Sequence, residues 1–126
     1  MPELNVEDWK THTTVRYQRE NIPSVAEITL MGHFWDILST FSETQRSRLL
    51  QFVTGSSSVP IEGFKALTSS DGQIRWFTLQ FVELNTDCIS SLYPHAHTCF
   101  NRLEIPLYDT KADLLQHLTS VRKTYV

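Results

Sequence analysis

The sequence is short of the features that mark nucleic-acid-binding and membrane proteins. Its 126 residues include 11 Lys and Arg against 14 Asp and Glu, with no basic run or stripe, so nucleic acid is not expected as the main partner. No apolar stretch approaches the roughly 20 residues that span a bilayer, and no signal peptide is recognisable. We therefore expect no membrane partner and an intracellular protein, in the cytoplasm or also in the nucleus.

Cysteine is scarce as well. Only Cys88 and Cys99 are present, whereas a disulfide framework in a chain of this size normally uses more. We therefore expect a reducing compartment and free thiols. Either thiol is then a candidate for reactivity.

The chain does contain enough apolar material for a core. Hydrophobic residues make up 40% of it and aromatic residues 11%, which argues against disorder of the whole chain. Its length suits one core but not two. We expect a single domain over residues 1–126.

Helical signals dominate the first half of the sequence. Asn5 and Asp8 predict a short helix over residues 6–11, followed by a loop to residue 23. A capping box at Ser24 opens an amphipathic helix, and a second one at Ser42 opens another that ends at Gly55. The first of these two helices has apolar residues at helical spacing: Ile28, Met31, Phe34, Trp35, Leu38 and Phe41.

The second half reads mainly as strands. Short strands are predicted over residues 64–67, 74–82 and 100–105, and a final helix is predicted after Thr110. The order of helices, then strands, then a helix predicts an α+β fold with a small sheet packed against several helices.

One segment stands out chemically. It runs from Pro94 to Asn101 and holds His95, His97 and Cys99, which would all point the same way in an extended chain. Cys99 could be a small buried apolar residue beside surface histidines. The three could be metal ligands, although a fourth ligand and the usual zinc spacings are missing. Alternatively, Cys99 is a nucleophile helped by a nearby imidazole, and the residues alone leave these alternatives open.

Four motifs recur in the order and spacing of a known catalytic domain. They are Val6-Glu7-Asp8-Trp9-Lys10, Phe34-Trp35, the stretch from Leu50 to Phe64, and Ala96-His97-Thr98-Cys99-Phe100-Asn101. Together they closely resemble the C-terminal lobe (C-lobe) of HECT-type ubiquitin ligases, over nearly the whole chain.

The resemblance implies a ubiquitin-protein transferase without cofactor or metal. In this family a cysteine takes ubiquitin from a ubiquitin-conjugating enzyme as a thioester and passes it to a lysine of a protein substrate. Cys99 would be that nucleophile. His97 would tune or orient the thiolate, or only bind the backbone, while Thr98 and Asn101 would shape the loop and donate hydrogen bonds to the thioester carbonyl.

The resemblance leaves other roles undecided. Asp87, Glu104 and Asp109 are equal candidates for an acid that assists the lysine, and the acid could instead lie on the partner lobe. The segment from Phe64 to Phe81 would pair with the tail of ubiquitin by β-augmentation, or only form core. His95 is expected to face solvent.

The sequence also departs from the family. The loop from Leu84 to Tyr93 is longer than usual, and Cys88 within it is interpreted as a bystander. Many relatives carry a phenylalanine four residues from the end, and that position here is Lys123. Either the tail is cut off, or Tyr125 partly replaces it, or this member does without it. The family's N-lobe, which recruits the conjugating enzyme, is expected as a partner from outside this chain, so the fragment alone should be weakly active.

Two other functions compete with the transferase. One is a catalytically silent lobe that binds ubiquitin or its partner lobe. The other is a cysteine protease, which ranks last because His12, His33 and His117 cannot be placed beside Cys99. The sequence does not reveal the substrate, the lysine linkage, the conjugating enzyme or the oligomeric state.

Overall fold

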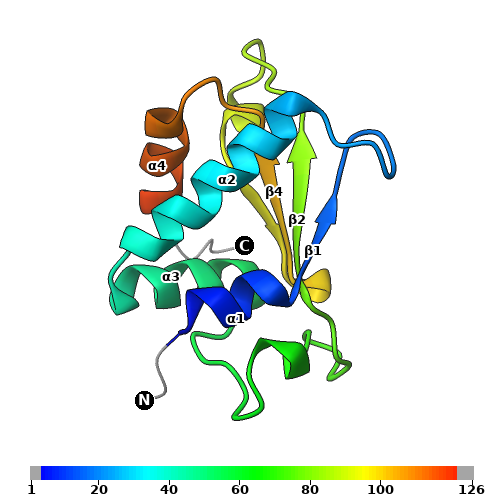
Figure 1. Cartoon of the computed structure of the whole chain (residues 1–126), viewed down its shortest axis with the longest axis vertical. Helices are drawn as coiled ribbons and strands as arrows, with labels where there is room; N and C mark the ends of the chain where they lie inside the picture. The colour runs from blue at the N-terminus through cyan, green and yellow to red at the C-terminus, as the bar shows by residue number, and fades with distance from the viewer. Residues whose placement is uncertain (1–3, 122–126) are drawn as a thin grey trace.

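The computed structural model describes residues 4–121 and confirms the α+β class for that part of the chain (Figure 1). No helix in residues 4–121 is both long and apolar enough to cross a membrane. The helices of this part are α1 (Val6–Thr11), α2 (Val25–Thr40), α3 (Glu43–Thr54) and α4 (Lys111–Thr119). The strands are β1 (Thr13–Arg16), β2 (Phe77–Val82), β3 (His95–His97) and β4 (Arg102–Pro106).

The strands form one mixed sheet in the order β1-β2-β4-β3. β2 runs parallel to both β1 and β4, and only β3 is antiparallel to its neighbour β4. Alternate residues of β2 are buried, as the sequence predicted: Phe77, Leu79 and Phe81 face the core. Thr78, Gln80 and Val82 alternate with them and are only partly buried, on the other face of the sheet.

Local capping explains why the helices begin and end where the sequence predicted. The side chains of Ser24 and Ser42 both complete capping boxes, which satisfy backbone N–H groups that a helix start leaves free. Gly55 closes α3 at a φ of 82°, in the left-handed region that favours glycine.

Glu27 extends its capping role to the preceding loop. It is buried, and its Oε2 accepts a hydrogen bond from the Gln18 N–H at 2.8 Å while Oε1 accepts one from Ser24 N–H at 2.9 Å. Burial raises the pKa of Glu27, but these hydrogen bonds outweigh it and leave the pKa below its usual value. The carboxylate thus ties the loop between β1 and α2 to the helix start.

Two predicted elements were wrong. The loop predicted over residues 12–23 contains the edge strand β1, which has only four residues and pairs with β2 far along the sequence. The strand predicted over 64–67 is instead a 3₁₀ turn at Phe64–Ala66, where Asp8 Oδ2 accepts a hydrogen bond from Phe64 N–H at 2.9 Å and no strand within residues 4–121 pairs with it. Long-range contacts decided both segments.

Two predicted strands begin later than expected. In the segment predicted over 74–82, the first residues turn back on the chain, since Arg75 N–H donates to the Leu67 carbonyl at 2.9 Å, and the strand begins at Phe77. In the segment predicted over 100–105, Phe100 belongs to a 3₁₀ turn and the strand begins at Arg102. The inward positions of Leu103 and Ile105 are confirmed.

The core is organised around Trp9, which is fully buried. Its ring stacks on Phe64, with centroids 4.9 Å apart, and makes edge contacts with Trp35 at 6.5 Å and Phe77 at 5.3 Å. Aromatic pairs of this kind stabilise beyond the area they bury. One side chain therefore joins α1, α2, β2 and the 3₁₀ turn at Phe64.

We predict that Trp9→Ala lowers the free energy of unfolding by about 3–5 kcal/mol, because it opens a cavity where four elements meet. The free energy of unfolding of a typical domain is only about 5–15 kcal/mol in total. Trp76→Ala is the matched control: Trp76 is 40% exposed, so its loss should cost about 1 kcal/mol. Urea unfolding followed by circular dichroism measures both, and equal losses would contradict a central role for Trp9.

Candidate active site

Cys99 lies in a 3₁₀ turn, Thr98–Phe100, that connects β3 to β4. Its side chain is a free, exposed thiol, so the interpretation of Cys99 as a buried apolar residue was wrong. β3 ends at His97, so Cys99 does not continue the row of His95 and His97 that an extended chain would have formed. Thr98 is exposed at the start of the turn.

Asn101 fixes the shape of this turn from inside the protein. It is fully buried and adopts a left-handed backbone conformation with φ 50°. Its Nδ2 donates to the backbone carbonyls of Thr68 at 3.0 Å and Arg75 at 2.8 Å. Both amide protons are used, so Asn101 shapes the loop, as expected. The side chain has no proton left for a thioester carbonyl, so that part of the expectation was wrong.

Phe100 anchors the turn from the outside. The ring is 48% exposed, so it does not pack into the core. The guanidinium groups of Arg75 and Arg102 lie 5.6 Å and 5.2 Å from its centroid, within the range of cation–π attraction. The turn that carries Cys99 is therefore held on both sides.

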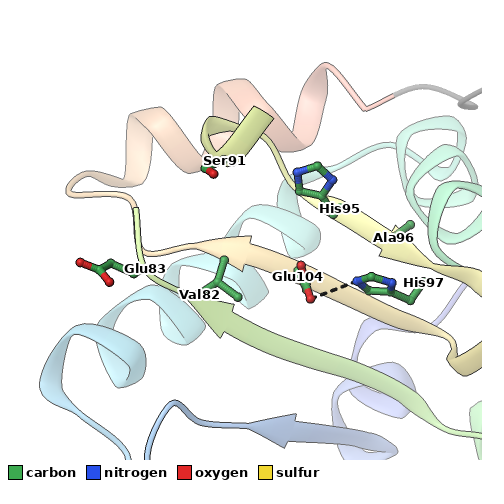
Figure 2. Close-up of a pocket in the computed structure, with 7 residues that line it drawn as sticks. All are labelled: Val82, Glu83, Ser91, His95, Ala96, His97 and Glu104. Atoms are coloured by element: carbon green, nitrogen blue, oxygen red, sulfur yellow. Dashed lines mark ion pairs between the residues drawn. The ribbon is translucent and has the colours of Figure 1, made fainter. Parts of the chain in front are cut away.

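His97 pairs with Glu104 across two neighbouring strands. The distance between His97 Nε2 and Glu104 Oε1 is 3.0 Å, and Figure 2 shows the contact. The β3–β4 register places His97 opposite Arg102 and His95 opposite Glu104, so the pair is diagonal. Asp87 and Asp109 are exposed and form no ion pair within residues 4–121, so Glu104 is the acid best placed near the turn.

The His97–Glu104 pair lines an open pocket of about 380 Å³. His95 and Ser91 form its upper wall in Figure 2, while the carboxylate of Glu83 points away from the pair at the outer rim. His95 is exposed, as expected, and its Nε2 donates to the Ser90 carbonyl at 2.6 Å. Val82 and Ala96 add apolar surface.

The metal and protease alternatives find no support in this geometry. No three His, Cys, Asp or Glu side chains within residues 4–121 gather closely enough to hold a metal ion, and His95, His97 and Cys99 do not form such a group. His12 pairs with Asp8 at 3.1 Å, and His117 stacks on Tyr108 with centroids 4.5 Å apart. Neither lines the pocket of His97.

β-augmentation is not available at β2, which is the part of the segment from Phe64 to Phe81 that lies in this sheet. β2 already pairs with β1 on one side and β4 on the other, and Phe77 and Phe81 are core residues. The sheet edges are β1 and β3, so only those strands have a free side for a further strand.

The sequence did not reveal the surroundings of Cys88. This residue is exposed in the long loop, ahead of a 3₁₀ turn at Ile89–Leu92, and its Sγ lies 3.2 Å from Ser90 Oγ. Hydrogen bonds from Ser90, and then from Ser91, lower the pKa of the Cys88 thiol to about 7. A lowered pKa increases the share of thiolate near neutral pH, which favours reactivity of Cys88.

Comparison with known proteins points to one family. The model of the HECT domain (ubiquitin-transferase) matches residues 1–122. The chain is 43% identical over 120 residues to "Probable E3 ubiquitin-protein ligase hulA" of Aspergillus niger and 40% identical over 118 residues to "E3 ubiquitin-protein ligase Smurf1" of Drosophila melanogaster. It is 43% identical over 113 residues to "E3 ubiquitin-protein ligase pub1" of Schizosaccharomyces pombe.

These matches cover nearly all of the chain but little of each relative. They include 94%, 92% and 89% of the chain, and only 13%, 10% and 13% of the length of the relatives, in the same order. The prediction about Lys123 lies outside the residues that the structure describes.

We predict that Asn101→Ala destabilises the domain by at least ~2 kcal/mol, because two carbonyls lose their donor and alanine is strained at positive φ. Asn21→Ala is the matched control: Asn21 also has a positive φ, 62°, but is exposed. Asn21→Ala should lower the free energy of unfolding by only about 1 kcal/mol. Chemical denaturation compares them, and an equal loss would mean that the buried amide bonds contribute nothing.

We predict that iodoacetamide alkylates Cys88 with a rate that rises through about pH 7, where its thiol ionises. Ser90→Ala removes the hydroxyl and should shift this rise to higher pH. Mass spectrometry of the Cys88 peptide, in a Cys99→Ala background, gives the rate. An unchanged pH profile in the Ser90 variant would contradict the assigned cause.

Proposed function

The chain belongs to the HECT-domain (ubiquitin-transferase) family, and we propose that it is a catalytic lobe in which Cys99 accepts ubiquitin. Ubiquitin arrives as a thioester on a ubiquitin-conjugating enzyme, moves to Cys99, and is then transferred to a lysine of a protein substrate. The relatives named above are E3 ubiquitin-protein ligases, which supports this assignment. The whole activity belongs to a longer protein, of which this chain matches a small share.

The observation that carries the proposal is the exposed thiol of Cys99 on a turn held from both sides. Buried Asn101 fixes the turn from within, and the arginines over Phe100 hold it from outside. Reactive groups are typically placed on such loops above a rigid scaffold. An exposed thiol gives no support to the alternative of a catalytically silent binding lobe.

The first step exchanges one thioester for another. The Cys99 thiolate attacks the carbonyl carbon, a bond from that carbon to Cys99 Sγ forms, and the bond to the sulfur of the conjugating enzyme breaks. The departing thiolate takes up the proton that Cys99 gave up. Because both sulfurs belong to similar thiols, the reaction free energy of the exchange is close to zero. The rate therefore depends mainly on how the thiolate and the thioester are positioned.

The second step joins ubiquitin to the substrate. The neutral amine of a lysine attacks the thioester carbon, a C–N bond forms, and the bond to Cys99 Sγ breaks with its electron pair on sulfur. One ammonium proton must leave before the attack, and the attached nitrogen gives up a second one, which the departing thiolate takes up. Cys99 is thereby regenerated for another cycle.

The proposal includes partners outside this chain. The conjugating enzyme and the N-lobe of the same ligase deliver ubiquitin, and tethering of the lobes supplies the effective concentration that a free lobe lacks. We propose the cytoplasm or the nucleus as the location, where thiols stay reduced. Both cysteines are free thiols, which supports this placement.

We predict that the full ligase containing this chain forms a ubiquitin adduct that Cys99→Ala abolishes. The adduct should vanish on reduction, because it is a thioester, and Cys99→Ser should leave an oxyester that resists reductant. Cys88→Ala is the matched control and should load normally. Non-reducing gels after incubation with activating enzyme, conjugating enzyme and ubiquitin provide the measurement, and an adduct that persists in Cys99→Ala would refute the assignment.

A further inference from the structure

The pair of His97 and Glu104 lies close to the reactive turn. His97 is two residues before Cys99, and two residues span at most about 7 Å of chain. Glu104 lies on β4, which pairs with β2 on one side and β3 on the other. Its side chain is only 25% exposed, while that of His97 is 43% exposed. A well-held carboxylate thus supports a more accessible imidazole.

The contact fixes how the imidazole is used. His97 Nε2 lies 3.0 Å from Glu104 Oε1 in an ion pair. A carboxylate beside Nε2 favours a proton on that nitrogen, which leaves the lone pair of a neutral imidazole on Nδ1. His97 Nδ1 makes no hydrogen bond within residues 4–121. The ring is therefore oriented by a carboxylate on one nitrogen and free to accept a proton on the other, which is the arrangement of a base and its orienting acid.

The other charged groups around the pair do not compete for the same role. Glu83 lies at the pocket rim with its carboxylate turned away, and His95 donates to the Ser90 carbonyl. Arg102, opposite His97 in the register, has its guanidinium over the Phe100 ring. Glu104 is the group whose carboxylate contacts His97.

We infer that His97 accepts the proton of the incoming lysine and that Glu104 is a positioning residue that orients His97 for this transfer. The inference rests on the proposed function of Cys99. The lysine ammonium gives one proton to His97 Nδ1, and the neutral amine attacks the thioester carbon. The C–N bond forms and the C–Sγ bond breaks, and the proton that the attached nitrogen must still lose passes to the Cys99 thiolate. The imidazolium, stabilised by Glu104, then releases its proton to solvent.

A purely structural role for the pair is the competing explanation. Ion pairs with this much solvent exposure add little to stability, and the β3–β4 backbone pairing does not need the side chains. Glu104→Gln should therefore fold, and its effect on the reaction can be measured directly.

The test compares two nucleophiles on the full ligase already loaded with ubiquitin on Cys99. After loading is stopped, the thioester is chased with free lysine or with hydroxylamine, which is uncharged at neutral pH and gives up no proton before attack. A base contributes about 10²–10⁴-fold to such steps. We expect Glu104→Gln to slow discharge to lysine at least ~10-fold and discharge to hydroxylamine less than about twofold.

Three further measurements sharpen the test. Glu104→Asp should restore part of the lysine rate, because it keeps a carboxylate. The difference between Glu104→Gln and the wild type in the rate of discharge to lysine should become smaller as the pH rises from about 7 to about 9, because more of the lysine is then already neutral. Asp109→Asn, which makes the same charge change at an exposed site outside the pocket, should discharge to lysine like the wild type.

Several results would overturn the inference. An unchanged lysine rate in Glu104→Gln would do so, and so would an equal slowing with both nucleophiles, which indicates a structural effect. A slow Asp109→Asn beside a normal Glu104→Gln would assign the role to Asp109. If the wild-type ligase forms no thioester at all, the proposed function itself fails, and this is visible before any nucleophile is added.

Discussion

The packing of Trp9 is the constraint on which the rest of the lobe depends. Helix α1 has only six residues and would not persist alone in water, so the aromatic contacts of Trp9 must hold it. The Thr13 hydroxyl donates to the Trp9 carbonyl at 2.6 Å, which fixes the start of β1. β1 then pairs with β2, and β2 with β4. The turn of Cys99 is attached to the end of this series of contacts.

Local signals in the sequence were sufficient for the helices and failed where distant partners decide. The capping boxes and Gly55 act within one turn of chain, so the ends of α2 and α3 were predictable. β1 was not, because four residues carry too weak an alternation and the pairing of Thr13 with Phe77 is what makes them a strand. The segment after Gly63 was predicted as a strand for the same reason: its 3₁₀ turn depends on a distant partner, Asp8.

In the candidate site, too, local features were predictable from the sequence and long-range contacts were not. The motif around Cys99 located the thiol and its neighbours, but not their contacts. The partners of Asn101 lie 33 and 26 positions earlier in the chain, and the pairing of His97 with Glu104 depends on the diagonal β3–β4 register. The lowered pKa of Cys88 depends on the contact of its thiol with the Ser90 hydroxyl. None of these is a property of spacing alone.

The central place of β4 in the sheet has a consequence for how the lobe is made on the ribosome. β4 lies between β2 and β3, so these two strands cannot be joined until residues 102–106 have left the exit tunnel. Such late, long-range pairing is typical of slowly forming sheets. Cys99 emerges before its turn can take shape, and a nascent chain therefore carries the thiol without a formed site around it until the lobe is nearly complete.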